Sequence, residues 1–202
     1  ATQLWEWLWL KSARSFDQMT NLSKEFRAKL AADFSFPVMT IANSQRSSDG
    51  TIKYAFRLDD GFLVEGVLIP TSERVTACIS SQVGCSLSCT FCATGFMKRE
   101  RNLRADEMYD QVAILREEAA REYGINLSNI VLMGMGEPLY NFENVRDAMK
   151  IAMDPEGISL SRRRITLSTS GVVPEIARTA TEIGCLLAIS FHATTNEVRD
   201  KL

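Results

Sequence analysis

The chain has 202 residues, of which 46% are hydrophobic and 24% charged, a balance typical of a globular protein with one substantial core rather than of a disordered chain. No apolar run approaches the roughly 18–20 residues that cross a bilayer, and the start lacks the basic flank of a signal peptide, so we expect a cytoplasmic protein with no membrane contact. The formal net charge of −2 excludes a global electropositive field, so any nucleic-acid binding must come from a local patch.

The first 35 residues show the spacing of helices. Apolar side chains recur about one helical turn apart, at Leu4, Trp5, Leu8 and Trp9. A second helix is expected to open at 22–25 and to run through Leu30. We therefore interpret residues 1–35 as a small helical accessory domain.

Residues 36–70 change to the pattern of extended chain. Three segments, 38–42, 52–58 and 62–69, are rich in strand-forming residues and are separated by turns that end in Asp-Gly. This rhythm predicts a β-meander extension.

From Arg74 onward, extended segments alternate with helical ones. The expected strands are 74–80, 130–133, 164–169 and 186–191. Helical spacing follows each of the first three, Gly184 is placed as a helix C-cap, and Glu197 opens a further helix. Successive βα units imply a parallel sheet whose functional loops lie at the carboxyl ends of the strands. We predict an α/β fold for residues 71–202, with four such units.

Cys85, Cys89 and Cys92 lie in one short loop, directly after the first expected strand of this alternation. Three thiolates are one ligand short of a closed tetrahedral zinc site. A 4Fe-4S cluster held by three cysteines keeps one iron free for a substrate or cofactor, and radical S-adenosylmethionine (SAM) enzymes use this CxxxCxxC spacing. A structural zinc site is the alternative, but it needs a fourth Cys or His nearby, and the only histidine, His192, is about a hundred residues away.

Small and polar residues follow the next three expected strands. Gly136 and Glu137 lie in a Gly-Met-Gly-Glu-Pro sequence, where a ligand can approach the backbone and a carboxylate can accept from its amino group. Ser168, Ser190 and His192 offer short polar side chains for a sugar and a carboxylate. These features together favour SAM binding, whereas an ordinary turn and polar strand ends explain each of them singly.

Two further residues are candidates for catalysis. Cys78 lies seven residues before the cysteine loop, where a thiolate can act as nucleophile or proton acceptor, although a buried free thiol is usually a small hydrophobe. Glu65 interrupts an apolar strand and is either the exposed member of an alternating strand or a buried base with a raised pKa. Cys185 begins an apolar strand and is expected in the core.

Two basic runs lie near the candidate site residues in the sequence. The first follows the cysteine loop and consists of Lys98, Arg99, Arg101 and Arg104. The second, 162–164, precedes the third expected strand of the alternation. Such runs are usually solvated surface. Located near one rim, they would instead contact phosphates, with Phe96 or Tyr140 stacked on a splayed base.

Together, these motifs resemble those of the bacterial RlmN family of radical SAM enzymes over essentially the whole chain. The matching segments are 80–85, the cysteine loop, 101–103, 134–139, 166–174, 192–193 and 197–200. The family methylates carbon 2 of an adenine in 23S ribosomal RNA and in tRNA. The resemblance therefore implies an RNA methyltransferase with a 4Fe-4S cluster and SAM as cofactors, and with 23S rRNA and tRNA as partners.

The resemblance also implies roles for individual residues. The cluster ligands are matched by Cys85, Cys89 and Cys92. The SAM-contacting positions are matched by Gly136, Glu137, Ser168, Ser190, Phe191 and His192. Glu65 matches the proton acceptor, and Cys78 matches a cysteine that helps to resolve a protein–RNA adduct by deprotonation and disulfide formation. A flavodoxin-type electron donor and a monomeric state are implied as well.

Two departures from the family are expected. The family's methyl-carrying cysteine lies after the last barrel strand, which places it beyond Leu202, and Cys185 does not match it, so the chain as given should lack methyl transfer. The family's partial radical SAM barrel has six βα units, and four units leave an open, apolar sheet edge. Two alternative functions stay open: Cfr-type methylation of carbon 8 of the rRNA adenine, and a zinc-stabilised RNA-binding module.

Overall fold

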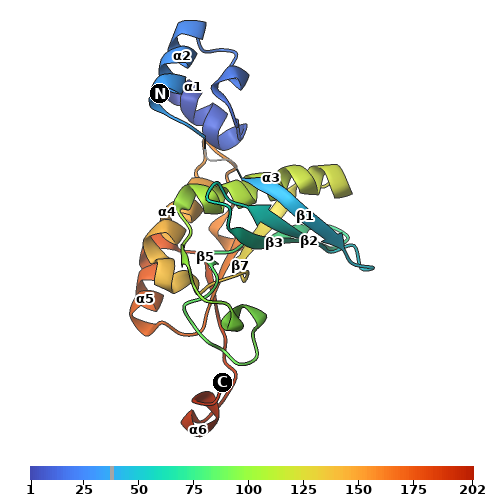
Figure 1. Cartoon of the computed structure of the whole chain (residues 1–202), viewed down its shortest axis with the longest axis vertical. Helices are drawn as coiled ribbons and strands as arrows, with labels where there is room; N and C mark the ends of the chain where they lie inside the picture. The colour runs from blue at the N-terminus through green and yellow to red at the C-terminus, as the bar shows by residue number, and fades with distance from the viewer. Residues whose placement is uncertain (37–38) are drawn as a thin grey trace.

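Seven strands form one mixed sheet in the computed structural model, which describes residues 1–36 and 39–202 (Figure 1). In their order across the sheet, they are β1 (Thr40–Arg46), β2 (Ile52–Arg57), β3 (Leu63–Pro70), β4 (Val75–Cys78), β7 (Leu127–Leu132), β8 (Ile165–Thr169) and β9 (Leu186–Ile189). The neighbours from β1 to β4 pair antiparallel, and those from β4 to β9 pair parallel. The meander therefore continues into the parallel sheet through β4.

Two helices cover one face of this sheet. They are α3 (Ala105–Tyr123) and α4 (Phe142–Met153), which pack against each other, and α3 also contacts β3, β4 and β7. The other helical segments are α1 (Thr2–Trp5), η1 (Glu6–Leu10), η2 (Phe16–Gln18), α2 (Lys24–Asp33), η3 (Ala93–Phe96), η4 (Pro138–Asn141), η5 (Arg162–Arg164), α5 (Val173–Arg178), η6 (Thr179–Ile183) and α6 (Asn196–Arg199). None of the helices in the described ranges is both long and apolar enough to cross a membrane.

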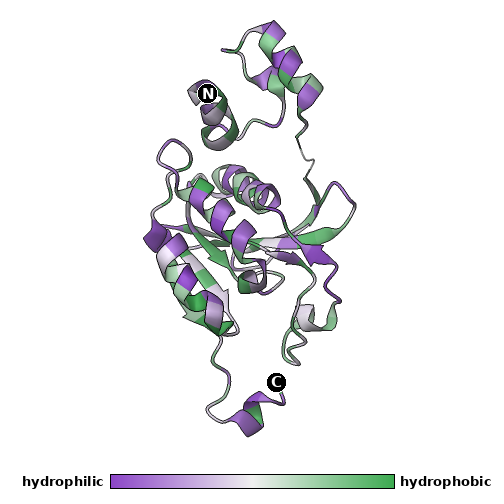
Figure 2. Ribbon diagram, turned by 90° about the vertical axis from the view of Figure 1, so that its left-hand side faces the viewer, coloured by the Kyte–Doolittle hydropathy of each residue, from purple (hydrophilic) through white to green (hydrophobic). Residues whose placement is uncertain are grey.

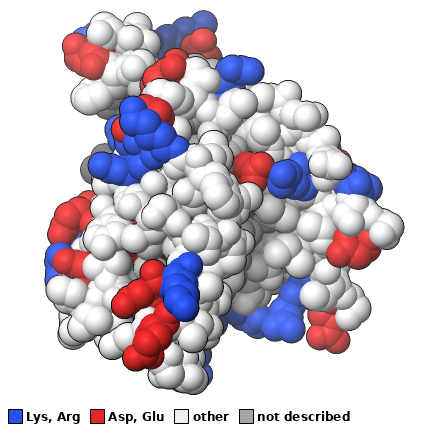
Figure 3. Space-filling view, turned by 60° about the horizontal axis from the view of Figure 1, so that its bottom comes forward, with Lys and Arg blue, Asp and Glu red and all other residues white. Residues whose placement is uncertain are grey.

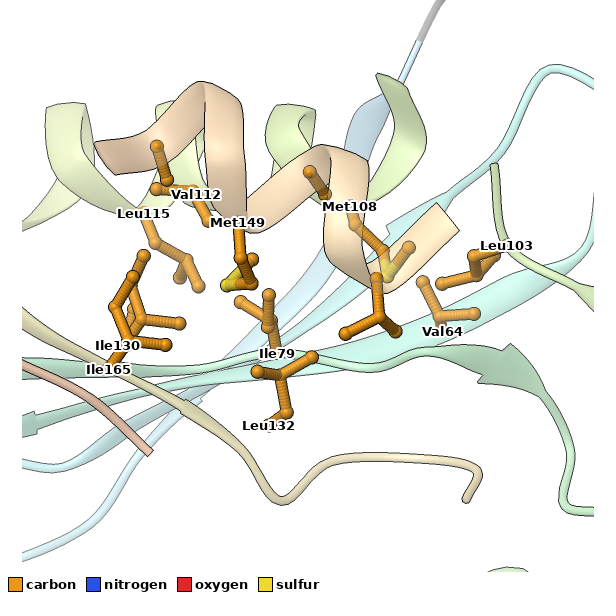
Figure 4. Packing of buried hydrophobic residues seen from close by; sticks show 14 of the residues in the cluster. Val64, Ile79, Leu103, Met108, Val112, Leu115, Ile130, Leu132, Met149 and Ile165 are labelled. Carbon is orange, nitrogen blue, oxygen red and sulfur yellow. The ribbon is translucent and has the colours of Figure 1, made fainter. Parts of the chain in front are cut away.

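The core lies between the sheet and these two helices, as the packed side chains in Figure 4 show. Val64 and Leu68 of β3 are fully buried on the helix-covered face, whereas Glu65 between them is exposed on the opposite, open face. Met108 of α3 and Ile130 of β7 are buried in the same cluster. Burying one such side chain contributes about 1.5–3 kcal/mol, so alternation along the strands fixes which face is covered.

Local signals define the ends of the helical segments. The Glu107 side chain accepts from the Arg104 amide at 2.8 Å, which satisfies a free N–H at the start of α3. Gly124 ends α3 with a φ of 66°. Gly184 ends η6 in the same left-handed conformation, with a φ of 74°, which confirms its predicted place as a C-cap.

A small ribbon closes the base of the cysteine loop. It pairs β5 (Gln82–Val83) with β6 (Arg101–Asn102). Val83 and Leu103, which flank the loop, belong to the core cluster, but no residue of 84–102 does, although all of them are described. The cysteine loop therefore lies outside the hydrophobic core.

The N-terminal lobe, residues 1–36, has an apolar cluster of its own. Its buried members are Ala13, Met19, Leu22 and Leu30. The lobe docks on α3, where the Tyr109 hydroxyl donates to the Trp9 carbonyl and Arg14 pairs with Asp110. Figures 1 and 2 show this lobe beyond α3, at the opposite end of the molecule from α6.

The predicted α/β fold with four parallel strands is confirmed, and the sheet is a partial barrel that does not close. The strand predicted at 38–42 corresponds to β1, which runs further, to Arg46, while residue 38 lies outside the described residues. The ribbon of β5 and β6 was missed because two-residue strands show no periodicity. Because β3 and β4 share one sheet, the division into 1–35, 36–70 and 71–202 stays a prediction.

Candidate active site

The carboxyl ends of the parallel strands surround a cavity of about 550 Å³. Its wall comes from the cysteine loop and from the loops after β7, β8 and β9. The predicted site residues in that wall are Cys85, Cys89, Cys92, Gly136, Glu137, Ser168, Ser190 and His192. The structure therefore brings together four loops that are far apart in the sequence, on one rim as predicted.

The three loop cysteines are free thiols that line this cavity. Cys85 Sγ accepts from the Leu87 amide at 3.4 Å, and burial, opposed by that hydrogen bond, raises the pKa of the Cys85 thiol. Within residues 1–36 and 39–202, no three His, Cys, Asp or Glu side chains are gathered closely enough to hold a metal as they stand. Bonds to a metal supply the free energy that draws such a loop together, and three thiolates fit a 4Fe-4S cluster with one open iron.

His192 lies in the same cavity wall, with its ring centroid 4.2 Å from that of Phe91 in the cysteine loop. Its distance in sequence therefore does not keep His192 from the cavity that the cysteines line. Phe191 lies between two lining residues, Ser190 and His192, but its side chain is 67% exposed and does not line the cavity.

The loop after β7 is pressed against the chain between β4 and β5. A Cβ on Gly134 would lie 2.7 Å from the Ile79 carbonyl oxygen, and one on Gly136, whose φ is 99°, would lie 2.5 Å from Gln82 Cβ. Glycine is needed at both positions because two segments of the chain meet there. The sequence interpretation explained these glycines by the approach of a ligand and did not include this contact.

Glu137 is buried at 4% exposure, and backbone amides hold its carboxylate. Oε1 accepts from the Leu139 amide at 3.0 Å, and Oε2 accepts from the Ser170 amide at 2.8 Å. A carboxylate fixed in this way keeps lone pairs for a cationic amino group in the cavity.

Cys78 ends β4 on the open face of the sheet, opposite Val67 and Val131. It is 8% exposed and does not line the cavity. Burial raises the pKa of its thiol to about 11, so Cys78 is a protonated thiol at neutral pH.

Glu65 is the exposed member of the alternation in β3, and the alternative interpretation as a buried base is wrong. Its side chain is 49% exposed, and its Oε1 lies 2.9 Å from Lys53 Nζ. Glu65 and Cys78 both belong to the open face of the sheet, but neither lines the cavity.

The two basic runs lie at opposite ends of the sheet, so the expectation that they share one rim is wrong. Arg162–Arg164 directly precedes β8, at the amino ends of the parallel strands. In the other run, Arg101 and Arg104 are engaged by acidic side chains, whereas Lys98 and Arg99 form no ion pair with a described residue. Figure 3 shows basic and acidic side chains dispersed over the end of the molecule that carries α6, without a continuous field of one sign.

Sequence reasoning missed a group of buried polar residues behind the cavity: Ser80, Gln82, Gln111 and Asn141. Gln111 Nε2 donates to the Ser80 carbonyl at 3.1 Å, and Asn141 Nδ2 donates to the Leu103 carbonyl at 2.7 Å. For Ser80 and Gln82, the available signal was their position shortly after an apolar strand, because buried polar groups must find partners.

Two protein-family models match separate segments of the chain. The Radical SAM superfamily matches residues 79–202, and the ribosomal RNA large subunit methyltransferase N-terminal domain matches residues 1–35. The crystal structure of a radical SAM methyltransferase from Sphaerobacter thermophilus is similar at a TM-score of 0.92 and 43% identity, covering 100% of this chain and 59% of that chain. The fold and the site thus define a radical SAM domain, a class that implies a 4Fe-4S cluster and SAM.

Curated relatives narrow this class. Proteins named dual-specificity RNA methyltransferase RlmN from Ruegeria sp. (strain TM1040) and Jannaschia sp. (strain CCS1) are each 61% identical over 99% of this chain, which covers 52% and 53% of their own lengths. The chain belongs to the RlmN family. It spans about half the length of the curated relatives that it matches.

Proposed function

We propose that the full-length protein methylates carbon 2 of adenine in 23S rRNA and tRNA, with a 4Fe-4S cluster and SAM. The observation that carries the proposal is the single cavity that joins the three cysteines to Glu137, Ser168, Ser190 and His192. The names of the relatives, dual-specificity RNA methyltransferases, support the RNA substrates.

Different residues of the cavity would bind the cluster and SAM. Cys85, Cys89 and Cys92 would hold the cluster, which when bound supplies the electron that cleaves SAM. Glu137, fixed by two backbone amides, would accept from the amino group of SAM. Polar groups at the ends of β8 and β9 would contact its sugar and carboxylate, namely Ser168, Ser190 and His192, with Phe191 beside them.

Glu65 and Cys78 would act on the adenine from the open face of the sheet. We assign Glu65 as the acceptor of the proton that leaves carbon 2, because its exposed carboxylate is accessible to a large substrate. We assign Cys78, a buried thiol, to the resolution of the protein–RNA adduct by deprotonation and disulfide formation. Tyr140, 50% exposed in the cavity wall, and Phe96, 79% exposed, are candidates for stacking on a base.

Two other functions are less well supported. Methylation of carbon 8 uses the same cysteine apparatus, but the relatives carry the RlmN name. A zinc-stabilised RNA-binding module does not account for the match to the Radical SAM superfamily over residues 79–202. We further propose a monomer in the cytoplasm, away from membranes, with a flavodoxin-type electron donor, because RNA substrates and reductive chemistry call for that setting.

The proposal is tested on full-length protein that is purified anaerobically and reconstituted with iron and sulfide. We expect iron at the level of one 4Fe-4S cluster per chain and release of 5′-deoxyadenosine from SAM under dithionite. Cys89→Ala should abolish the brown colour, whereas Cys185→Ala, which removes a thiol packed against the core, should retain it. Bound zinc, or a well-folded chain without iron, would overturn the proposal in favour of the binding module.

A further inference from the structure

One buried side chain contacts two of the four loops that build the candidate site. Gln82 lies in β5 and is 0% exposed. Its Oε1 atom accepts from the Ser86 amide in the cysteine loop at 3.1 Å and from the Glu137 amide in the loop after β7 at 3.0 Å. A single oxygen atom therefore joins the segment that carries the cysteines to the segment that carries the buried carboxylate.

The other end of the Gln82 amide fixes its orientation. Nε2 donates to Ser86 Oγ and to Asn102 Oδ1, both at 2.8 Å. Asn102 offers its oxygen there because its own Nδ2 donates to the Tyr140 carbonyl at 3.1 Å. A flipped Gln82 amide would face two N–H groups with its own N–H₂, so only one orientation satisfies the whole network.

The backbone around Gln82 leaves little room for adjustment. The Gln82 amide donates to the Met135 carbonyl at 3.2 Å, and the Ser81 amide donates to the same oxygen at 2.8 Å. Gly136 packs so closely on Gln82 that a Cβ would lie 2.5 Å from the Gln82 Cβ. Buried networks of this kind are costly to leave half satisfied, so the two loops are held at one separation.

We propose that Gln82 is a positioning residue that sets the cysteine loop against the loop of Glu137, and thereby fixes the cluster ligands relative to the carboxylate that receives SAM. This inference rests on the proposed function, because it assigns SAM to both loops. Without Gln82, each loop keeps its own ligands but their separation varies, and a ligand that spans both loops binds more weakly.

The first test uses full-length protein without a cluster and measures amide-resolved hydrogen exchange. In Gln82→Met, the amides of Ser86 and Glu137 should both exchange about tenfold faster, because both lose the same acceptor. Gln111→Met is the matched control: Gln111 is also 0% exposed, but its contacts are with Ser80 and the Glu107 carbonyl. It should leave both amides protected.

The second test uses the cluster-loaded protein. Gln82→Met should bind an unchanged amount of iron while its Kd for SAM rises roughly tenfold, and Gln111→Met should leave that Kd unchanged. Unchanged exchange of Ser86 and Glu137 in Gln82→Met would overturn the positioning role, whatever the activity. A different outcome separates the two proposals. If both amides exchange faster in Gln82→Met but the wild-type protein binds no cluster, Gln82 does couple the two loops and the proposed function is overturned.

Gln82→Glu covers the case in which the methionine variant does not fold. The carboxylate keeps the oxygen acceptor for the two amides and removes only the N–H₂ donor to Ser86 Oγ and Asn102 Oδ1. Both amides should therefore stay protected in this variant, and their joint deprotection would overturn the proposal.

Discussion

Lys53 Nζ lies 2.9 Å from Glu65 Oε1 across β2 and β3, on the open face of the sheet. Both side chains are about half exposed, at 50% and 49%. An exposed pair of this kind contributes only about 0.2–1 kcal/mol, so a substrate opens it at little cost. The ion pair therefore orients the Glu65 carboxylate but is weak enough for a substrate to displace Lys53.

Glu65→Gln should abolish turnover in the full-length protein while the cluster is retained. Loss of a general base lowers a rate by about 10²- to 10⁴-fold, and the amide of glutamine does not accept the proton. Methylated adenine is counted by mass spectrometry beside the iron content. Glu73→Gln, in the exposed turn before β4, serves as the control and should be fully active. Undiminished turnover of Glu65→Gln would remove Glu65 from the mechanism.

Cys78 should be the slowest thiol of the site to react with iodoacetamide in the folded protein without cluster. Its pKa of about 11 arises from burial. At pH 8, about one Cys78 side chain in a thousand is then a thiolate, which is the reactive form. Its labelling rate, followed by peptide mass spectrometry, should rise about tenfold per pH unit up to that pKa. Labelling as fast as that of Cys89 at pH 8 would contradict this expectation.

Arg101→Met should destabilise the protein, because Arg101 neutralises a buried carboxylate. Its guanidinium donates to Glu107 Oε1 at 2.7 Å and Oε2 at 2.8 Å, and to Asp60 at 2.7 Å, while the Glu107 side chain is 3% exposed. Breaking such a pair from one side costs about 2–3 kcal/mol here, below the fully buried case since Arg101 is partly solvated.

Urea unfolding measures this cost. Lys29→Met is the control, because Lys29 is 71% exposed and its pair with Glu25 should contribute under about 1 kcal/mol. The double variant Arg101→Met/Glu107→Gln should recover part of the loss, since no unpaired charge stays buried. Equal midpoints for the two single variants would show that the Glu107 pair carries no special weight.

Asp110 should make the stability of the folded chain depend on pH. Burial raises the pKa of this carboxyl from 3.8 to about 6, and Arg14 opposes the shift. Because the folded state then binds the proton more tightly than the unfolded state, Asp110 stabilises the fold at low pH. That contribution, on the order of 2–3 kcal/mol, is lost as pH rises from about 4 to about 6.

Asp110→Asn should therefore unfold with a free energy that changes less between pH 4 and pH 6 than that of the wild type, as measured by urea titration. Asp33→Asn, at the exposed end of α2, should keep the wild-type slope. The same slope in Asp110→Asn would show that Asp110 titrates alike in the folded and unfolded states.

The main features of the site could be predicted because they are local in sequence. Three cysteines within eight residues, and glycine next to Glu137 after an apolar strand, carry their chemistry in their spacing. Parallel βα units then bring those loops to one rim without further information. The burial of Val64 and the exposure of Glu65 likewise follow from alternation once the strand is known.

Other features depend on contacts that no spacing encodes. The place of Gln82 between two loops requires Ser86 and Glu137 to meet, and these residues are 51 positions apart. Arg162–Arg164 resembles a phosphate-binding run in sequence, but its position directly before β8 puts it at the far end of the sheet. His192 shows the converse, because sequence distance concealed its proximity to Phe91.

The absence of residues 84–102 from the buried apolar cluster, all of them described, bears on how the protein matures. The sheet, α3 and α4 complete their hydrophobic packing without the cysteine segment, so folding does not have to wait for iron. A cluster can therefore be inserted after the core has formed, at cysteines that line the cavity wall. Cys89 and Cys92, which are partly exposed in that wall, are open to oxidants until iron binds.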